Sequence, residues 1–210
     1  MFSAKPWAEK RFLVAGSKGQ IGKALTQALI KDVGAANVVA SDLADSDSSV
    51  PCKYEKLDVT DKARYEQLVK DHKIDYIVHL AAIISSLGEK NFDLAYNINV
   101  NATKNVFDIA REHKCQVYLP SSIAVFGGDA FNKDNTSNDA VTQPKTIYGV
   151  SKVFNEQLGE YMDKKFGVDF RCLRYPGVIS SANFGFNGTA YWTTGKFLIL
   201  FLTFNCRNLF

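Results

Sequence analysis

Short apolar runs alternate with longer amphipathic segments along the chain. A short apolar run is typical of a strand buried on both faces, and apolar residues at helical spacing are typical of a helix packed on a core. We predict strands over residues 11–17, 37–43, 54–61, 74–82, 115–122 and 168–177. We predict helices over residues 20–33, 62–72 (with Asp61 as N-cap), 92–112 and 147–166. This alternation predicts an α/β fold with a doubly wound parallel sheet of the Rossmann type.

Composition narrows the class of protein. The chain of 210 residues is 46% hydrophobic and 22% charged, which is typical of a globular protein. Its length fits one domain of ordinary size or a large domain that lacks a part. Its net charge of +3 comes from interspersed residues without a basic run, so we expect no nucleic-acid partner. The longest apolar run, 197–204, is shorter than the ~20 residues that a membrane helix needs, so we expect no membrane association. The segment before the first strand is too short for a secretory signal, and we expect a cytoplasmic or mitochondrial protein.

The four cysteines lie far apart and form no CxxC motif or Cys/His cluster. We interpret Cys52, Cys115, Cys172 and Cys206 as reduced thiols, because neither a disulfide framework nor a zinc site has the spacing it needs.

Glycines mark the junction of the first predicted strand and helix. Gly16, Gly19 and Gly22 form a G-x-x-G-x-x-G pattern there, with Gln20 and Ile21 between the last two. A glycine turn lets the backbone approach a pyrophosphate, whose charge is stabilised by the helix N-terminus. Such a triplet alone is also compatible with an ordinary turn, but the order of strand, glycines and amphipathic helix favours a dinucleotide site at all five positions.

Asp42 ends the second predicted strand, 26 positions after Gly16. A carboxylate at that place can accept hydrogen bonds from ribose hydroxyl groups. It would also repel a 2′-phosphate, so we predict NAD rather than NADP as cofactor. The alternative is that Asp42 is a cap or turn residue.

Two further strand ends carry candidate cofactor contacts. Asp58 and Val59 close the third predicted strand and could face an adenine, although a turn-forming aspartate is the alternative for Asp58. Leu80, Ala81 and Ala82 end the fourth strand, where small residues let a flat cofactor pass close to the backbone. Small residues also suit a plain strand-to-loop junction.

Three residues suggest proton-transfer chemistry. Tyr148 and Lys152 lie one helical turn apart at the start of the last helix, and Ser122 ends the fifth strand. A phenol with a pKa of ~10 is a poor base at neutral pH, and a nearby ammonium group lowers that pKa. The three could remove the proton of an alcohol while a hydride leaves the same carbon for NAD. This needs no metal, and we see no metal site in the sequence; the alternatives are an exposed helical pair and a turn hydroxyl.

The motifs "HLAA", "NVNAT", "PSSIAVFG", "YGVSK" and "RYPG", in this order, resemble the extended short-chain dehydrogenase/reductase superfamily, which includes nucleotide-sugar epimerases and dehydratases. Within it, "GSKGQIG", "TIYGVSK" and "LRYPGVIS" are more similar to the L-threonine 3-dehydrogenase branch. The resemblance covers about residues 10–190. It implies oxidation of the C3 hydroxyl of L-threonine to 2-amino-3-oxobutyrate with formation of NADH.

The resemblance also implies roles for individual residues. Tyr148 is expected to be the general base, and Lys152 is expected to position the nicotinamide ribose. Asn99 is expected to belong to the cofactor site and to support the active-site helix. Further expected contacts are Tyr175, Pro176 and Val178 with the nicotinamide, and Ser85, Ser122 and Thr189 with an amino-acid substrate. A homodimer through the two long helices is also expected.

The chain departs from that branch near its end. "GFNGTAYW" (185–192) has Ala190 and Tyr191 where the branch has threonine and aspartate. We therefore expect an NAD-binding domain over 10–180, and over 181–210 a remnant of a C-terminally truncated substrate domain. A nucleotide-sugar epimerase or dehydratase, or an inactive NAD-binding fragment, remain as alternatives.

Overall fold

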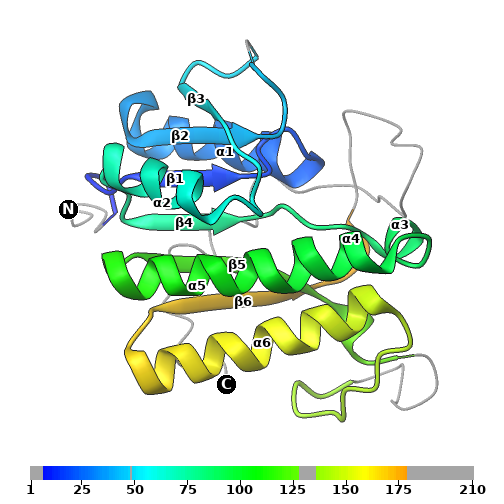
Figure 1. Ribbon diagram of the computed structural model, residues 1–210. Helices are drawn as coiled ribbons and strands as arrows, with labels where there is room; N and C mark the ends of the chain where they lie inside the picture. The colour runs from blue at the N-terminus through cyan, green and yellow to red at the C-terminus, as the bar shows by residue number, and fades with distance from the viewer. Residues whose placement is uncertain (1–6, 48, 128–135, 179–210) are drawn as a thin grey trace.

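The computed structural model describes residues 7–47, 49–127 and 136–178. Within them, all strands are parallel and form one six-stranded sheet of order β3-β2-β1-β4-β5-β6 (Figure 1). The strands are β1 (Phe12–Ala15), β2 (Val38–Asp42), β3 (Lys53–Lys56), β4 (Tyr76–His79), β5 (Gln116–Ser122) and β6 (Phe170–Tyr175). This confirms the predicted Rossmann-like sheet. The strand order reverses between β1 and β4, which is where ligands bind in such sheets.

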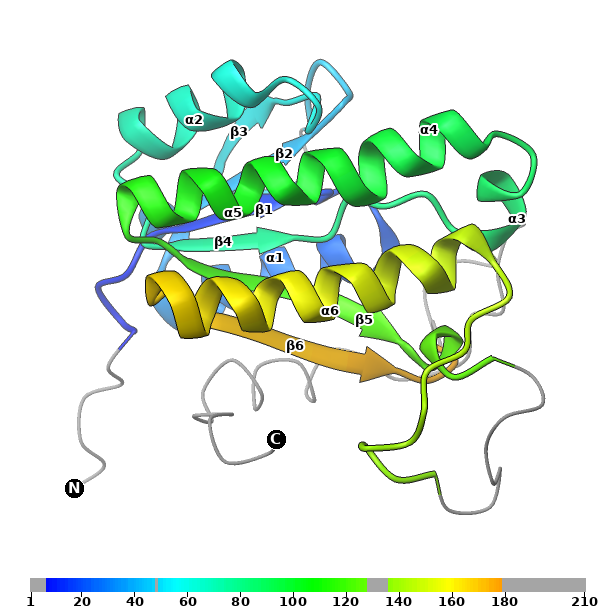
Figure 2. The same ribbon diagram turned by 60° about the horizontal axis from the view of Figure 1, so that its bottom comes forward.

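Helices cover both faces of the sheet. Figures 1 and 2 show α1 on one face and α2, α5 and α6 side by side on the other. The helices are α1 (Gln20–Val33), α2 (Lys62–Asp71), α3 (Ser85–Gly88), α4 (Phe92–Tyr96), α5 (Ala102–His113) and α6 (Ile147–Phe166). Short helical turns are η1 (Ala35–Asn37), η2 (Asn97–Asn101) and η3 (Ile123–Val125).

Two apolar clusters correspond to the two faces. One joins Leu13, Ile77 and Val117 of the strands to residues of α2, α5 and α6, including the fully buried Phe107. The other joins alternate strand residues, such as Val14, to the inner face of α1. Because successive side chains of a strand point to opposite faces, burial on both faces explains why β1 is apolar at every position.

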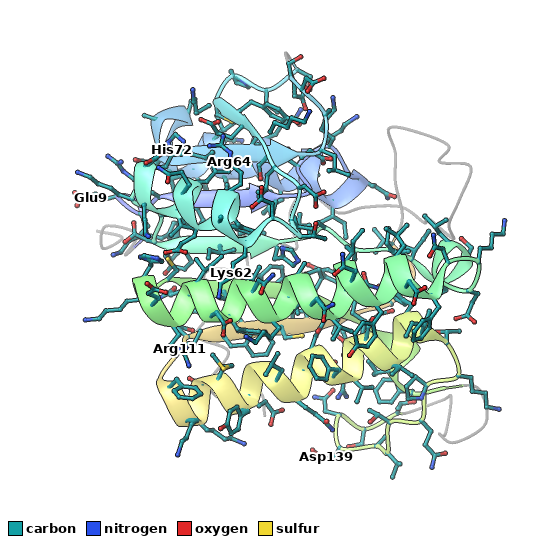
Figure 3. The ribbon with its side chains drawn as sticks, in the orientation of Figure 1. Glu9, Lys62, Arg64, His72, Arg111 and Asp139 are labelled. Atoms are coloured by element: carbon teal, nitrogen blue, oxygen red, sulfur yellow. The ribbon has the colours of Figure 1, made fainter. Side chains whose placement is uncertain are left out.

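Two side-chain contacts join neighbouring helices on the face covered by α2, α5 and α6. Lys62 at the start of α2 donates to Asp108 of α5 at 3.1 Å. The guanidinium of Arg111 on α5 lies 4.9 Å from the ring centroid of Phe166 at the end of α6. Figure 3 labels Lys62 and Arg111 at these junctions. These contacts join α2 to α5 and α5 to α6.

The predicted long helix over 92–112 forms as α4, η2 and α5, which follow one another without interruption. The middle segment, Asn97–Asn101, is a π-helical turn, which widens the helix by one residue and is often found at functional sites. The helix N-cap predicted at Asp61 is confirmed, since its carboxylate accepts a hydrogen bond from the amide of Arg64 at 2.9 Å.

Several strands are shorter than predicted, and the chain past β4 forms the short helix α3, which the periodicity did not predict. The expected contact Thr189 and the expected remnant over 181–210 lie outside the described residues. No helix in the part of the chain that the structure describes is long and apolar enough to cross a membrane.

Candidate active site

The glycine turn lies between β1 and α1 at the carboxyl edge of the sheet. Gly16 has a φ of +90°, and a Cβ atom there would lie 2.8 Å from the amide nitrogen of Ala81. A Cβ atom on Gly22 would lie 2.1 Å from the Gly16 carbonyl oxygen. Gly19, the N-cap of α1, has no side chain to accept hydrogen bonds from the first helical turn. The N-terminal amide groups of Gln20 and Ile21 are therefore left for an anion, which fits the pyrophosphate of a dinucleotide.

Asp42 is the last residue of β2 and is half-buried. Its carboxylate accepts hydrogen bonds from the amide of Lys18 at 2.9 Å and from the amide of Leu43 at 2.8 Å. These bonds tie the carboxylate to the glycine turn and leave acceptor capacity at both oxygens. Asp42 is therefore both a turn-bound residue and a carboxylate at the place where ribose hydroxyls are expected.

We expect Asp42→Ala to weaken NAD binding about tenfold or more, because a charged acceptor for the ribose hydroxyls is lost. NADP binding should weaken less, because the same change removes repulsion of the 2′-phosphate. Titration calorimetry with both dinucleotides checks this, with the exposed Asp45→Ala as control. An unchanged ratio of the NAD and NADP dissociation constants would remove the argument for NAD.

Asp58 and Val59 follow β3 and face different ways. Asp58 is exposed, and its carboxylate accepts hydrogen bonds from the amide and the hydroxyl of Thr60, at 2.9 and 2.7 Å. This is the turn geometry that the sequence left open for Asp58. The side chain of Val59 is buried in the core, which leaves its backbone as the part that could face a cofactor.

A cavity of about 750 Å³ opens beyond the ends of β4, β5 and β6. Its walls include these residues predicted from the sequence: Ile21, Leu80, Ala82, Ser85, Ser122, Tyr148, Lys152, Tyr175, Pro176 and Val178. The predicted residues that do not line it are Gly16, Gly19, Gln20, Gly22, Asp42, Asp58, Val59, Ala81 and Asn99. Except for Asn99, which lies in a helix, these belong to the glycine turn and strand ends beside the cavity. The cavity volume is in the range of small-molecule sites.

Ser122, Tyr148 and Lys152 meet on one side of this cavity. Ser122 ends β5, and its hydroxyl both accepts from the amide of Ala124 at 3.2 Å and hydrogen-bonds Tyr148. Tyr148 lies in the first turn of α6, which begins after the N-cap Thr146. The ammonium of Lys152 lies 5.4 Å from the centroid of the Tyr148 ring. The arrangement puts a hydroxyl, a phenol and an ammonium within reach of one bound molecule.

Burial dominates the electrostatics of this group. Lys152 is 4% exposed and donates to the carbonyl oxygen of Pro120 at 2.7 Å. Desolvation lowers the pKa of Lys152 to about 8. Desolvation also raises the pKa of Tyr148, and the hydrogen bond with Ser122 opposes that rise only in part. The lowering of the Tyr148 pKa by Lys152 that the sequence led us to expect is not seen in this structure, because the ammonium is turned to the Pro120 carbonyl.

Tyr175 enters the cavity from the end of β6. Its hydroxyl hydrogen-bonds the hydroxyl of Tyr118 on β5, and burial raises the pKa of Tyr175 to about 12. The phenol is thus neutral and held in place. Pro176 and Val178 continue the same wall, as the resemblance implied.

Asn99 supports the site from a distance. Its side-chain oxygen accepts a hydrogen bond from the amide of Ile83 at 2.8 Å, and its side-chain nitrogen donates one to the Ile83 carbonyl oxygen at 2.9 Å. It also donates to the hydroxyl of Ser151, and its backbone carbonyl accepts from Asn155; both residues are on α6. Asn99 thus links the segment after β4 to the helix of Tyr148, and no part of it lines the described cavity.

His79, at the end of β4, is buried beneath the site. Its Nδ1 hydrogen-bonds the Tyr65 hydroxyl at 3.3 Å, while Nε2 has no partner among the described residues. The ring is therefore hydrogen-bonded at only one of its two nitrogens by the described residues. Burial, with a smaller contribution from Lys152, lowers the pKa of His79 to about 3, so the ring is neutral in the folded protein.

This neutral histidine should make the protein acid-sensitive. The unfolded chain takes up a proton at His79 as pH falls below about 6.5, while the folded protein does so only near pH 3. The stability that His79 contributes should therefore fall with falling pH by about 1.4 kcal/mol per pH unit within that window. In urea unfolding at pH 7 and pH 5, the difference in unfolding free energy between wild type and His79→Gln should narrow at the lower pH. A difference independent of pH would contradict this.

One group of potential metal ligands lies away from the site, and the sequence did not indicate it. Ligand atoms of Glu66, Glu112 and His113 lie within 4.8 Å of one another, near the ends of α2 and α5. Glu66 already pairs with His113 and with Lys70, which lowers its pKa. The cavity is at the opposite end of α5.

Some cavity residues were not predicted. They are Ile84, Ser86, Pro120, Ser121, Ile123, Ala124, Gly127, Lys145, Thr146 and Gly177. Most of them adjoin predicted residues in the sequence, so the predicted strand ends could have indicated them as well. Lys145 and Thr146 precede the predicted helix, and the N-cap preference of threonine was a usable signal for the second.

Comparisons with known proteins identify the family of the chain. The model of the NAD-dependent epimerase/dehydratase family matches residues 12–192, so the chain belongs to that family. A curated relative, an uncharacterised epimerase/dehydratase of Staphylococcus aureus strain USA300, is 40% identical over 81% of this chain. That alignment covers 54% of the relative, so the chain spans about half the length of the curated relatives it matches.

Solved structures of L-threonine dehydrogenases are also similar. The enzyme of Clostridium difficile is 41% identical with a TM-score of 0.77, over 82% of this chain and 55% of that one. L-threonine 3-dehydrogenase of Trypanosoma brucei is 41% identical with a TM-score of 0.80, over 85% of this chain and 56% of that one. The sheet and its carboxyl edge are therefore shared with these proteins.

Proposed function

We propose that the chain carries the catalytic half of an NAD-dependent dehydrogenase that oxidises the C3 hydroxyl of L-threonine to 2-amino-3-oxobutyrate. The observation that carries the proposal is the meeting of Ser122, Tyr148 and Lys152 on a cavity at the carboxyl edge of the sheet. The likeness to L-threonine dehydrogenases at about 41% identity supports L-threonine as substrate.

The residues present fit NAD as cofactor. At the glycine turn, no capping side chain occupies the first amides of α1, which can therefore bind a pyrophosphate. Asp42 offers a carboxylate to the ribose hydroxyls. Ile21 belongs both to the turn and to the cavity wall, so one extended molecule can span the two regions. When bound, NAD supplies the nicotinamide ring that accepts a hydride.

The chain's own groups would handle the proton. In the proposed mechanism the substrate hydroxyl lies between the oxygens of Ser122 and Tyr148, as both side chains line the cavity. Ser122 fixes the position of the hydroxyl, and Tyr148 in its phenolate form takes the proton. Because burial raises the pKa of Tyr148, that form needs a positive charge nearby. Lys152 is the cation in place, and a turn of its flexible stem away from Pro120 would bring the ammonium to the phenol or to a ribose.

The test is a pair of assays on the purified chain. NADH formation is followed with L-threonine and NAD, and epimerisation is followed with a UDP-sugar. The proposal predicts NADH with L-threonine and no turnover of the UDP-sugar. Turnover of the sugar alone would favour the epimerase or dehydratase activity after which the family is named. Calorimetric binding of NAD without any turnover would favour an inactive NAD-binding fragment.

We further propose a homodimer through the outer faces of α4 and α6, in a reducing compartment. Phe92 and Tyr96 on α4 and Phe154 and Tyr161 on α6 are at least 40% exposed. Large apolar side chains gathered on neighbouring helices support burial against a second copy. The cysteines within the described part of the chain are free, as expected of cytoplasmic or mitochondrial proteins.

A further inference from the structure

Arg174 lies on β6, directly before the cavity residue Tyr175, and is not itself one of the residues that line the described cavity. Its guanidinium donates two parallel hydrogen bonds to Glu156 of α6, from Nε to Oε1 at 2.9 Å and from Nη2 to Oε2 at 2.8 Å. The two side chains are only 21% and 14% exposed. A two-pronged ion pair that is mostly shielded from solvent holds its partners in a fixed orientation, which a surface ion pair does not.

The same guanidinium contacts two further segments beside the site. Nη1 donates to the backbone carbonyl of Asn138 at 2.8 Å, and Cζ lies 4.9 Å from the ring centroid of Phe126. Phe126 ends the short helical turn η3, which begins at Ser122, and Asn138 belongs to the segment that leads into α6. Figure 2 shows α6 lying over β5 and β6. Arg174 therefore joins α6, the turn of Ser122 and the segment before α6.

Glu156, the partner of this guanidinium, also acts on Lys152. It follows Lys152 by four residues on α6, so the two side chains share a face of the helix. Desolvation lowers the pKa of Lys152 to about 8, and the charges of Cys172 and Glu156 oppose that fall. Burial raises the pKa of Cys172 to about 12, so its thiol is neutral at neutral pH and Glu156 is the charged one of the two. The carboxylate thus favours the cationic form of Lys152, which the proposed proton transfer needs.

The other groups that face Lys152 come from three elements. They are His79 of β4, the Pro120 carbonyl of β5 and Tyr148 of α6 itself. His79 takes up a proton only near pH 3, and burial raises the pKa of Tyr148, so neither changes its charge in the neutral range. Among these described neighbours, the ion pair is therefore the part whose charges should govern the titration of Lys152.

We propose that Arg174 is a positioning residue of the proton-transfer site. Through Glu156 it balances the charge that acts on Lys152. Through Phe126 it holds the turn of Ser122 against α6. This rests on the proposed function and adds to it an ion pair outside the cavity on which the site depends. An arginine is required, because a lysine cannot bind a carboxylate with two parallel bonds and also lie flat on a ring.

The experiment follows the Lys152 ammonium directly, by NMR titration of the full chain isotopically labelled at lysine Cε. The Lys152 signal is assigned by its loss in Lys152→Met. Wild type is compared with Arg174→Met, with Glu156→Gln and with the variant that carries both changes. Arg171→Met is the matched control, since this arginine lies on the same strand and pairs with Asp169 at 3.1 Å.

Glu156→Gln should lower the titration midpoint of Lys152 by about one pH unit, because a neighbouring negative charge is lost while Arg174 remains. Arg174→Met should raise the midpoint, because the charge of Glu156 is then unbalanced. The double variant is neutral at both positions and should lie between the two, and Arg171→Met should leave the midpoint unchanged. A merely structural role would not move the two single variants in opposite directions.

NADH formation from L-threonine is the second readout. Arg174→Met should lower kcat about tenfold and change the dissociation constant for NAD by no more than about twofold, because the contacts of Arg174 are to α6 and the turn of Ser122. Arg174→Lys keeps the charge and loses the fork, so it should keep the Lys152 midpoint near that of wild type and recover only part of kcat. Melting temperatures show that each variant is folded.

Two outcomes would overturn the inference while leaving the proposed function in place. One is a Lys152 midpoint that is the same in wild type and in both single variants, or that moves in the same direction in both. The other is a wild-type kcat in Arg174→Met. If wild type forms no NADH from L-threonine, the proposed function fails, and the Lys152 midpoints still decide whether the ion pair acts on Lys152.

Discussion

Replacement of Tyr148 by phenylalanine should reduce NADH formation from L-threonine by about a thousandfold or more, because the change removes the hydroxyl that is proposed to take the proton. The change removes one oxygen from a half-buried ring and leaves the glycine turn and Asp42 untouched. The dissociation constant for NAD should therefore change by no more than about twofold. Initial rates of NADH absorbance and calorimetric titration with NAD measure the two effects.

The matched control for this variant is Tyr161→Phe, on the outer face of the same helix. It removes the same atom from a ring that does not line the cavity and leaves the apolar surface proposed for the homodimer in place, so it should retain full activity. Turnover retained in Tyr148→Phe would refute the proton-transfer role. Loss of activity in both variants would show that the helix, rather than the phenol, is what matters.

Addition of a single methyl group at Gly22 should weaken NAD binding strongly. In Gly22→Ala, the new Cβ atom would lie 2.1 Å from the Gly16 carbonyl oxygen and 2.7 Å from Ser17 Cα, both in the backbone. No side-chain rotation relieves such contacts, so α1 must move away from the turn and its N-terminus leaves the pyrophosphate position. We expect the dissociation constant for NAD to rise by about a hundredfold, together with a fall in melting temperature.

Gly167→Ala separates the effect of packing from that of backbone strain. Gly167 ends α6 with a φ of +69°, and a Cβ atom there would meet nothing within 4 Å. This variant should lose about 1 kcal/mol of stability and keep its affinity for NAD. NAD binding by Gly22→Ala at wild-type strength would show that the glycine turn does not hold the cofactor.

The sequence predicted the centre of the sheet because strands such as β1 are buried on both faces and therefore apolar, as Leu13 and Val14 show. The edge strand β3 is polar and partly exposed, so its apolar content was a weaker signal. Strand ends at one edge of a parallel sheet must lie together, which brought Ser122, Tyr175 and Leu80 to one cavity. Residues whose position depends only on this edge of the sheet could therefore be predicted from the sequence pattern.

Other features depend on tertiary contacts that no pattern records. At the π turn, the side-chain amide of Asn99 hydrogen-bonds the backbone of Ile83, which lies 16 residues earlier in the sequence. The start of α6 is held by the hydrogen bond between Glu89 and Ile147, which are 58 residues apart. The raised pKa of Tyr148 could not be predicted either, because it reflects burial rather than spacing.

The central claim is that Ser122, Tyr148 and Lys152 form a working dehydrogenase site for L-threonine. The most direct measurement is the initial rate of NADH formation by the purified chain with saturating NAD and L-threonine, with and without Tyr148→Phe. We predict NADH formation that depends on both L-threonine and the Tyr148 hydroxyl. Tight binding of NAD with no NADH formed from L-threonine would contradict the account.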